Sequence, residues 1–273
     1  MSISSAFSIA RSGLSTTEGR ASLVAGNIAN AQTEGYVRRE AAQVSTNGQS
    51  GTVELRIARQ VDERLAGMSR NASAELGQAS ATSEILGSYL ITLGEPGDEV
   101  SPAARLAEFQ AGLDLLANNP SDPAAQNDLL SRSETLVHSI NKAAVELEAS
   151  RGQAGDSLVS SVGEVNAALS DIAELNERLA LAGTDPTGTS GLMDEMNRRL
   201  DALGTQMDFQ GRWEADGTLT LHTTGGTELV HGETAVKLSA NRDTGRLMAG
   251  DVDITPNSPT ARGSDSGRLA GLS

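Results

Sequence analysis

The chain has 273 residues, about two domains by length, and 38% of them are apolar, which is enough for a modest core. Its formal net charge of −15 repels nucleic-acid phosphates and disfavours anionic membrane surfaces. Cysteine is absent, which excludes disulfides, thiolate nucleophiles and cysteine-ligated metals, and the aromatic content of 2% suits close-packed helices better than a thick globular core.

The first 30 residues predict one helix. Apolar side chains recur there in alternating steps of four and three residues, which is the pattern of a coiled-coil seam. One position of this seam is polar, Thr17. Three glycines each cost about 1 kcal/mol relative to alanine, so this helix needs a partner seam to cover it. The plainer alternative is an amphipathic helix lying on the core of its own domain. The proposed assembly interface consists of Ile3, Phe7, Ala10, Leu14, Ala21, Val24 and Ile28.

The stretch "NIANAQTEGYVRR" then ends the helix. Asparagine tolerates the left-handed conformation, and glycine lets the chain turn again. The stretch resembles the Asn-Ile-(Ala/Ser)-Asn…Thr-x-Gly-Tyr signature of bacterial flagellar rod, hook and hook-associated proteins. The resemblance implies that the N-terminal helix pairs with a C-terminal helix and that many copies build an axial tube. The motif positions are Asn27, Asn30, Thr33, Gly35 and Tyr36.

Because this chain offers no matching C-terminal heptads, we expect the large side chains of the seam to be exposed or to pack on another copy. Those side chains are Phe7, Leu14, Val24 and Ile28.

Residues 31–60 are predicted to form a linker, with a loop over 31–51 and a short strand over 52–60. A bundle of antiparallel helices is expected over 61–208. Ser101-Pro102 is the start signal of the second helix, and Asp122-Pro123 is that of a third helix that reaches about residue 182. Within this third helix, Gly152, Gly155 and Gly163 could cause a bend. The loop "GTDPTGTS" precedes the last helix, with Ser190 near its cap.

The apolar stripes of these helices are expected to face the bundle interior. They include Leu65, Met68, Leu76, Leu86 and Leu90 in the first helix, Leu106, Phe109, Leu113 and Leu116 in the second, and Leu130, Val137, Ile140, Ala144 and Leu147 at the start of the third.

Residues 209–273 change to short β-favouring runs separated by Asp-Gly, Gly-Gly and His-Gly pairs. They predict a separate β-meander, a strand around "RLMAGDVDI" and a tail rich in glycine, serine and aspartate. The expected fold is mainly α: a long antiparallel helical bundle with an N-terminal coiled-coil-type helix and a small β-rich unit near the C-terminus.

Motifs for catalysis or ligand binding are missing. His138, His222 and His231 lack metal-site spacing, and "GTDPTGTS" has Thr189 where a phosphate loop needs lysine. No G-x-S-x-G elbow occurs. We therefore expect no catalytic residues, cofactor, metal or nucleotide. No apolar run approaches the roughly 20 residues of a membrane span, and no cleavable signal peptide is recognisable.

Two inner stretches sharpen the resemblance. "NNPSDPAAQNDLLSRSETLVHSIN" and "GLMDEMNRRLDALG" resemble helices of the hook-associated proteins at the first hook–filament junction. Those proteins are usually longer, so the chain is expected to correspond to their N-terminal part. The resemblance implies a structural subunit, not an enzyme, that joins hook to filament by self-assembly. Its implied partners are copies of itself, hook protein, the second hook–filament junction protein and the flagellar export apparatus, and its implied location is outside the cell.

Two other readings stay open. A rod or hook subunit would share the first motif but not the inner stretches. A cytoplasmic helical adaptor would explain the seams without secretion.

Overall fold

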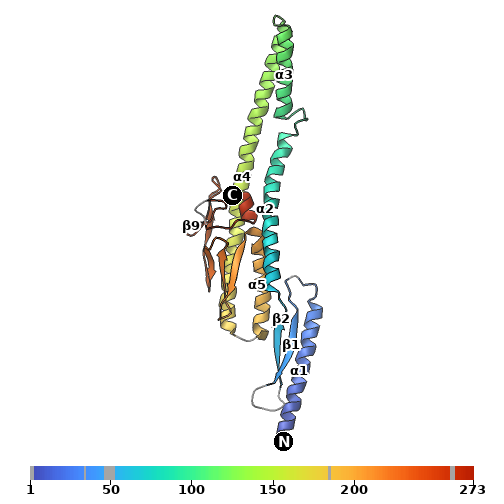
Figure 1. Cartoon of the computed structure of the whole chain (residues 1–273), viewed down its shortest axis with the longest axis vertical. Helices are drawn as coiled ribbons and strands as arrows, with labels where there is room; N and C mark the ends of the chain where they lie inside the picture. Colours follow the sequence, from blue (N-terminus) through green and yellow to red (C-terminus); the bar gives the residue numbers. More distant parts are fainter. Residues whose placement is uncertain (1–2, 34, 46–52, 184–185, 259–261) are drawn as a thin grey trace.

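The computed structural model describes residues 3–33, 35–45, 53–183, 186–258 and 262–273, and the molecule is strongly elongated (Figure 1). One end holds the helix α1 (Ile3–Ala29) and the strands β1 (Arg39–Ser45) and β2 (Val53–Arg59). The other end is the tip between the helices α3 (Pro102–Asn118) and α4 (Pro123–Ala182). Long helices dominate, and small antiparallel sheets occur near the C-terminus, which confirms the expected fold class.

Local caps begin the long helices where the sequence places them. α2 (Glu63–Leu93) starts after Asp62, whose side chain accepts hydrogen bonds from two backbone N–H groups of the first turn. Ser101 caps α3 and Asp122 caps α4, each by accepting one hydrogen bond from a backbone N–H group of the first turn, and each is followed by proline. With 60 residues and a rise of about 1.5 Å each, α4 is about 90 Å long. It continues through its glycines without interruption.

α5 (Pro186–Gln206) begins earlier than expected. Ser190 lies inside this helix, so its prediction as a residue near the cap was wrong. The physical reason is Pro186, whose fixed φ suits the first helical turn and whose missing N–H costs nothing there.

The predicted loop over 31–51 was wrong for residues 39–45, which form β1. β1 pairs antiparallel with β2, from Arg39 opposite Arg59 to Ser45 opposite Val53. Its own residues alternate poorly, and the strand exists because β2 supplies its hydrogen bonds and α1 packs against the hairpin. β2 confirms the predicted strand over 52–60 for residues 53–59. Residues 46–52, which belong to the predicted loop and strand, lie outside the described residues.

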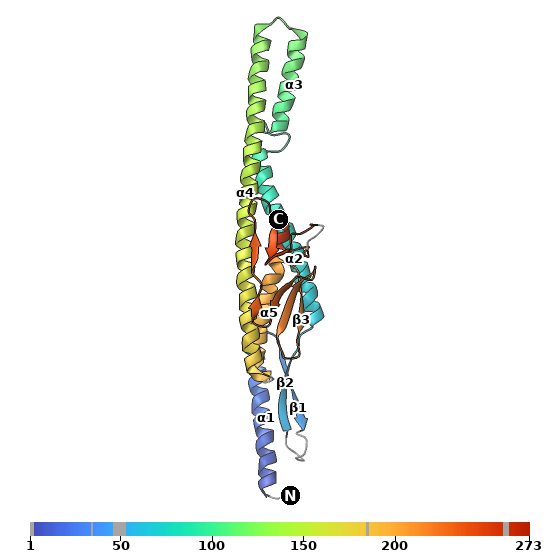
Figure 2. The same cartoon turned by 90° about the vertical axis from the view of Figure 1, so that its left-hand side faces the viewer.

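The C-terminal region contains two small antiparallel sheets beside the C-terminal half of α4 (Figure 2). The first has the order β3 (Phe209–Trp213), β4 (Leu219–Thr223), β5 (Glu228–His231) and β6 (Thr234–Ala235), which confirms the meander. The second contains β7 (Leu238–Ala240), β8 (Leu247–Ala249) and β9 (Val252–Asp253). The short helix α6 (Arg268–Leu272) was not expected and packs against α2.

The β-region shares one hydrophobic core with the helices. The division at residue 208 stays a prediction about domains, but the packed core crosses it. Buried Asn176 of α4 accepts a hydrogen bond from Leu219 N and donates to the carbonyl oxygens of Leu219 and Gly232, each at 2.8 Å. The core includes Leu158, Val165, Leu169, Ile172, Met196, Leu203, Leu221, Leu229, Leu247 and Leu269.

Several apolar stripes do not face the interior, contrary to the expectation. α2 buries Ala74, Gly77 and Ala81 instead, because small residues let helices approach closely. A Cβ atom at Gly77 would lie 2.3 Å from the carbonyl oxygen of Thr205 in α5. The exposed large residues include Leu65, Met68, Leu76, Leu86 and Leu90 of α2, Leu106 and Leu113 of α3, and Leu130, Val137, Ile140 and Leu147 of α4.

Candidate assembly interface

The residues of the Asn-Thr-Gly-Tyr motif build the turn after α1. The Asn30 side chain donates to the carbonyl oxygen of Gly26 at 3.0 Å, which ties off the helix end. The hydroxyl of Thr33 donates to Asn30 Oδ1 at 3.2 Å, and the backbone N–H of Tyr36 donates to the carbonyl oxygen of Thr33 at 3.1 Å. Gly35 has a φ of 74°, which favours glycine. The motif is therefore a hydrogen-bonded reversal of the chain.

Asn27 joins α1 to the first strand. Its Nδ2 donates to the carbonyl oxygen of Arg39 at 2.8 Å, and its Oδ1 accepts from Arg39 N at 3.0 Å. The phenol of Tyr36 also donates to Asn27 Oδ1 at 2.8 Å. The Asn27 side-chain amide thus forms hydrogen bonds with both the N–H and the C=O group of Arg39, as the backbone of a neighbouring strand would. The structure brings four of the motif's residues, at positions 27, 30, 33 and 36, into this single network.

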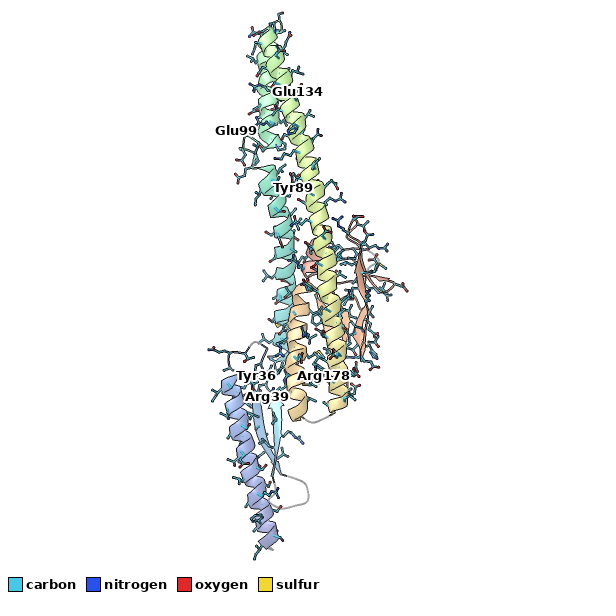
Figure 3. The ribbon with its side chains drawn as sticks, turned by 180° about the vertical axis from the view of Figure 1, so that it is seen from behind. Tyr36, Arg39, Tyr89, Glu99, Glu134 and Arg178 are labelled. Atoms are coloured by element: carbon cyan, nitrogen blue, oxygen red, sulfur yellow. The ribbon has the colours of Figure 1, made fainter. Side chains whose placement is uncertain are left out.

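A buried ion cluster fastens the hairpin to α5. Asp194, 4% exposed, accepts from Arg59 Nη2 at 2.8 Å and from Arg39 Nη2 at 2.9 Å. The guanidinium of Arg39 also lies 5.3 Å from the centroid of the Tyr36 ring (Figure 3). We call these three residues, Asp194, Arg39 and Arg59, the Asp194 cluster. Sequence reasoning missed it because its members lie far apart in the chain and carry no local signal.

The α1 helix carries two different faces. The face on the hairpin is made of small or partly covered residues such as Ile9, Thr16, Gly19 and Leu23. A Cβ atom at Gly19 would lie 2.8 Å from Leu55 Cδ2 of β2, so glycine permits this close contact. Two residues correspond to a rotation of about 200°, which places Leu14 on the opposite side from Thr16.

All members of the predicted seam lie on the open face. The exposed fractions of its large residues are between 54% and 92%. The expectation that Phe7, Leu14, Val24 and Ile28 are exposed is confirmed. The alternative, in which the helix packs this seam against the core of its own domain, is wrong for this chain. That the seam binds other helices stays a prediction.

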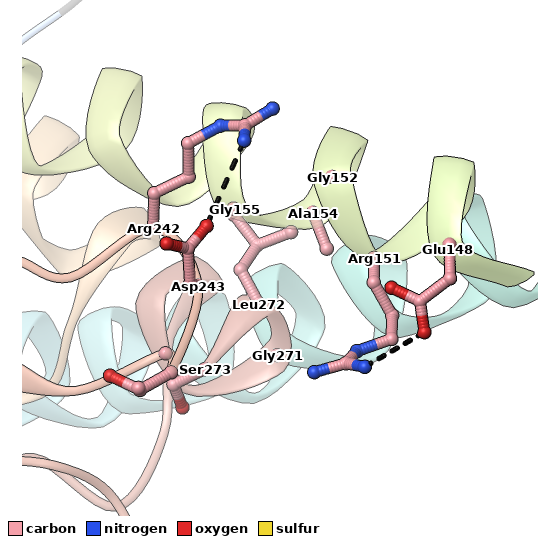
Figure 4. Close-up of a pocket in the computed structure, with 12 residues that line it drawn as sticks. Glu148, Arg151, Gly152, Ala154, Gly155, Arg242, Asp243, Gly271, Leu272 and Ser273 are labelled. Carbon is pink, nitrogen blue, oxygen red and sulfur yellow. Dashed lines mark hydrogen bonds and ion pairs between the residues drawn. The ribbon is translucent and has the colours of Figure 1, made fainter.

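Among the hollows between described residues, one beside α4 is lined by charged groups that pair with one another (Figure 4). Arg151 Nη1 donates to Glu148 Oε1 at 3.0 Å, and Arg242 Nη1 lies 3.8 Å from Asp243 Oδ1. Arg242 also pairs with Asp156, which lies outside the hollow. The hydrogen bond from Arg242 holds the pKa of the Asp156 carboxyl below its usual range. Each of these side chains therefore lies beside one of opposite charge.

The histidines offer no clear chemistry either. Glu228 Oε2 lies 4.0 Å from His222 Nε2 and 3.8 Å from His231 Nδ1, at the protein surface. Within the described ranges, no three His, Asp or Glu side chains are arranged to hold a metal ion. A membrane-spanning helix is likewise not found in the part of the chain that the structure describes.

Comparison with known proteins finds one family and several relatives. The family model described as flagellar hook-associated protein FlgK helical domain matches residues 92–273. Flagellar hook-associated protein 1 of Salmonella typhimurium is 25% identical over 251 residues, covering 87% of this chain and 44% of that protein. For the Escherichia coli protein of the same name, the identity is 24% over 269 residues, covering 93% and 48%. For that of Bacillus subtilis it is 25% over 239 residues, covering 80% and 46%.

A solved structure shows a similar fold. The flagellar hook junction protein FlgK from Burkholderia pseudomallei matches with a TM-score of 0.60 and 21% identity, covering 76% of this chain and 38% of that one. The chain spans about half the length of the curated relatives it matches. Because the family model covers two thirds of the sequence, from the end of α2 through the β-region, the chain belongs to the flagellar hook-associated protein FlgK family.

Proposed function

We propose that this chain is a structural subunit of the bacterial flagellum, which joins hook to filament by self-assembly into an axial tube. The observation that carries the proposal is the exposed apolar seam of α1 in a chain of the FlgK family. The proposed partners are copies of itself, hook protein, the second hook–filament junction protein and the export apparatus. The subunit acts outside the cell by binding alone.

The energetics of the seam favour association. Burying one Leu, Ile, Val or Phe side chain contributes about 1.5–3 kcal/mol, and α1 leaves five such side chains exposed. A partner helix with the same heptad period would cover them together. Because α1 lies at one end of the elongated molecule, a neighbouring helix reaches this seam without meeting the body of the chain (Figure 1).

The position of α1 is also held in advance. Asn27 fixes the chain reversal, and the Asp194 cluster fixes the hairpin to α5. A helix held in one orientation loses less conformational entropy on binding than a freely jointed one, so each contact in a tube contributes more to affinity. The Asn27 junction gives the family motif a physical role in this assembly.

The alternatives have less support. The family model matches the region that contains both inner stretches, which a rod or hook subunit is not expected to share. A cytoplasmic adaptor would account for the exposed seam, but not for relatives named for the flagellar hook. An enzyme has less support still, because the family consists of structural flagellar proteins.

The test uses charge substitutions on α1 in the bacterium that encodes the chain. We expect Leu14→Glu in the seam to abolish filament attachment and motility, because a buried carboxylate without a partner opposes helix packing. Ser22→Glu adds the same charge at an exposed position outside both faces and should leave assembly intact. Normal filaments with Leu14→Glu would contradict the proposal.

Deletion of residues 1–30 separates assembly from folding. Of the residues of α1, the structure buries Thr16 alone, so the deletion should change the thermal midpoint of the remaining chain very little while it abolishes incorporation into filaments. If α1 belonged to the core, the loss of several buried side chains would approach the whole stability of a domain, about 5–15 kcal/mol. Collapse of the truncated chain in a thermal melt would therefore overturn the seam's assembly role.

A further inference from the structure

A hollow between α1 and β1 is lined by three arginines and one acidic residue. These residues are Arg20, Arg38, Arg39 and Glu40, and the volume of the hollow is about 250 Å³. Pockets that hold a drug-sized molecule usually measure about 300–1,000 Å³, so this hollow suits a few side chains of a protein partner better than a free ligand. We call it the arginine hollow.

The positive charge of the arginine hollow is only partly neutralised. Arg38 Nη2 lies 3.0 Å from Glu40 Oε1, and Arg39 pairs with Asp194 of the body. Arg20 is exposed and forms no ion pair within the described parts of the chain. The hollow therefore presents an excess of positive charge, although the whole chain carries a net charge of −15.

The two ends of the molecule differ in charge. Residues 1–60 contain six arginines and four glutamates, whereas residues 95–148 contain ten acidic and three basic residues. α1 and its hairpin lie at one end of the long axis, and α3 with the first half of α4 lies at the other (Figure 1). Copies that follow one another along this axis would bring surfaces of opposite charge together, which favours their association.

The loop between α2 and α3 concentrates acidic side chains in the second of these ends. Glu95, Asp98 and Glu99 fall within five residues, and no lysine or arginine occurs from residue 71 to residue 104. Asp98 N donates to the carbonyl oxygen of Glu95 at 2.9 Å, and Asp98 Oδ2 accepts from Glu95 N at 2.8 Å, so the loop is held in one shape. We call residues 94–101 the acidic loop.

The carboxylates of the acidic loop are available to a partner. Glu95 and Glu99 are exposed, and neither forms an ion pair among the residues that the structure describes. A loop with a fixed shape loses little conformational entropy when it binds. The acidic loop thus matches the arginine hollow in charge and is small enough to enter it.

The arginine hollow cannot receive the acidic loop of its own chain. The helix α2 separates the hairpin from this loop, and its 31 residues make it about 45 Å long. Figure 3 shows Arg39 near one end of the molecule and Glu99 far from it. A second copy must supply the loop. Because the two surfaces are different, the contact repeats from copy to copy without closing, as an axial tube requires.

We propose that the arginine hollow of one copy binds the acidic loop of the next copy along the tube. The inference rests on the proposed function, which supplies the neighbouring copy, but the arginines lie outside the α1 seam. Single exposed ion pairs are weak, so the contact between two copies should be weak and should gain strength from repetition in the lattice.

The test is an exchange of charge in the 273-residue chain with Leu14→Glu, which disables the α1 seam. The hollow variant adds Arg20→Glu and Arg38→Glu, and the loop variant adds Glu95→Lys and Glu99→Lys. In sedimentation equilibrium at low salt, the Kd of self-association should rise at least tenfold for each variant alone, because like charges then meet. An equimolar mixture of the two variants should regain association, because each unchanged surface then meets its unchanged partner.

The matched control is Lys142→Glu with Lys237→Glu, two exposed residues outside both surfaces, which changes the net charge as the hollow variant does. Circular dichroism checks that each variant is folded. A parent chain that stays monomeric at every concentration, equal weakening by the control, or a mixture that does not regain association would overturn the proposal. None of these outcomes would refute the α1 seam, whereas normal filaments with Leu14→Glu would refute the seam alone.

Crosslinking provides a readout that does not depend on affinity. The chain has no cysteine, so each substituted chain reports a single site. Ala41 lines the arginine hollow, and a Cβ atom at Gly97 of the acidic loop meets no atom within 4 Å. Mild oxidation of Ala41→Cys mixed with Gly97→Cys should yield a mixed covalent dimer. Gly163→Cys, at an equally open position of α4, should yield much less with Ala41→Cys. Equal yields would mean random collision and would overturn the proposal.

Discussion

Replacement of Asp194 by alanine tests how the α1 end is attached to the body. The substitution leaves Arg59 and Arg39 without their carboxylate, and these side chains are 12% and 26% exposed. Removing one partner of a buried ion pair costs about 3–5 kcal/mol, because the remaining charge is poorly solvated. Since both arginines can partly regain water, we expect the lower value, about 3 kcal/mol.

The loss of stability should appear locally, in the β1–β2 hairpin. Amide hydrogen exchange of β1 and β2 reports the free energy of local opening, and about 3 kcal/mol corresponds to a roughly hundredfold faster exchange. Amides in the C-terminal half of α4 should stay protected, because that half packs in the shared core.

The matched control is Asp201→Ala in the same helix. Asp201 Oδ1 lies 2.7 Å from Arg70 Nε, a distance similar to those of the Asp194 cluster, but the Asp201 side chain is 58% exposed. Arg70 itself is 13% exposed, but it also donates to Asn197 Oδ1 at 3.2 Å and therefore keeps a partner when the solvated carboxylate is removed. This variant should lose only about 0–1 kcal/mol and exchange almost normally. Equal, small effects of both substitutions would refute the reasoning and would mean that apolar contacts alone hold the hairpin.

Four other substitutions test three separate features. Asn27→Ala removes the hydrogen bonds that join α1 to β1, so exchange at the start of β1 should accelerate by an amount equivalent to about 1–3 kcal/mol. Gly155→Ala should destabilise the chain in urea, because its Cβ atom would lie 2.2 Å from the carbonyl oxygen of Arg242, whereas Gly163→Ala meets no atom within 4 Å and should stabilise it, by up to about 1 kcal/mol. Hydrogen bonds from a neighbouring threonine, and then a nearby arginine, lower the pKa of Asp253 from 3.8. This stabilisation is present above the pKa of Asp253 in the unfolded chain and is lost as the pH falls through its pKa in the folded chain. The difference in stability between the native chain and Asp253→Asn should therefore be seen at pH 7 and vanish in acid. A difference that persisted below both pKa values would contradict the assignment.

Local signals in the sequence determined where the helices begin. Ser101-Pro102 and Asp122-Pro123 were predicted as starts and are the starts of α3 and α4. These predictions succeed because a cap is made by a side chain and a backbone N–H only two or three residues away. The end of α1 and the change to β-structure near Phe209 were predictable for the same reason.

The sequence also identified the seam of α1, but not the face that the same helix buries. Periodicity shows which residues share a side of a helix and does not show what covers it. In α1 and α2 the structure covers faces of small residues, because glycine and alanine permit the closest approach, and leaves the large apolar residues outside.

The pairing of β1 with β2 and the Asp194 cluster were decided by the tertiary structure alone. Arg39 and Arg59 meet Asp194 across 155 and 135 residues of chain. No window of sequence contains both partners, and each arginine read by itself resembles an ordinary surface charge. Such contacts depend on the distance between folded elements, and that distance exists only after α5, the hairpin and α1 have packed together.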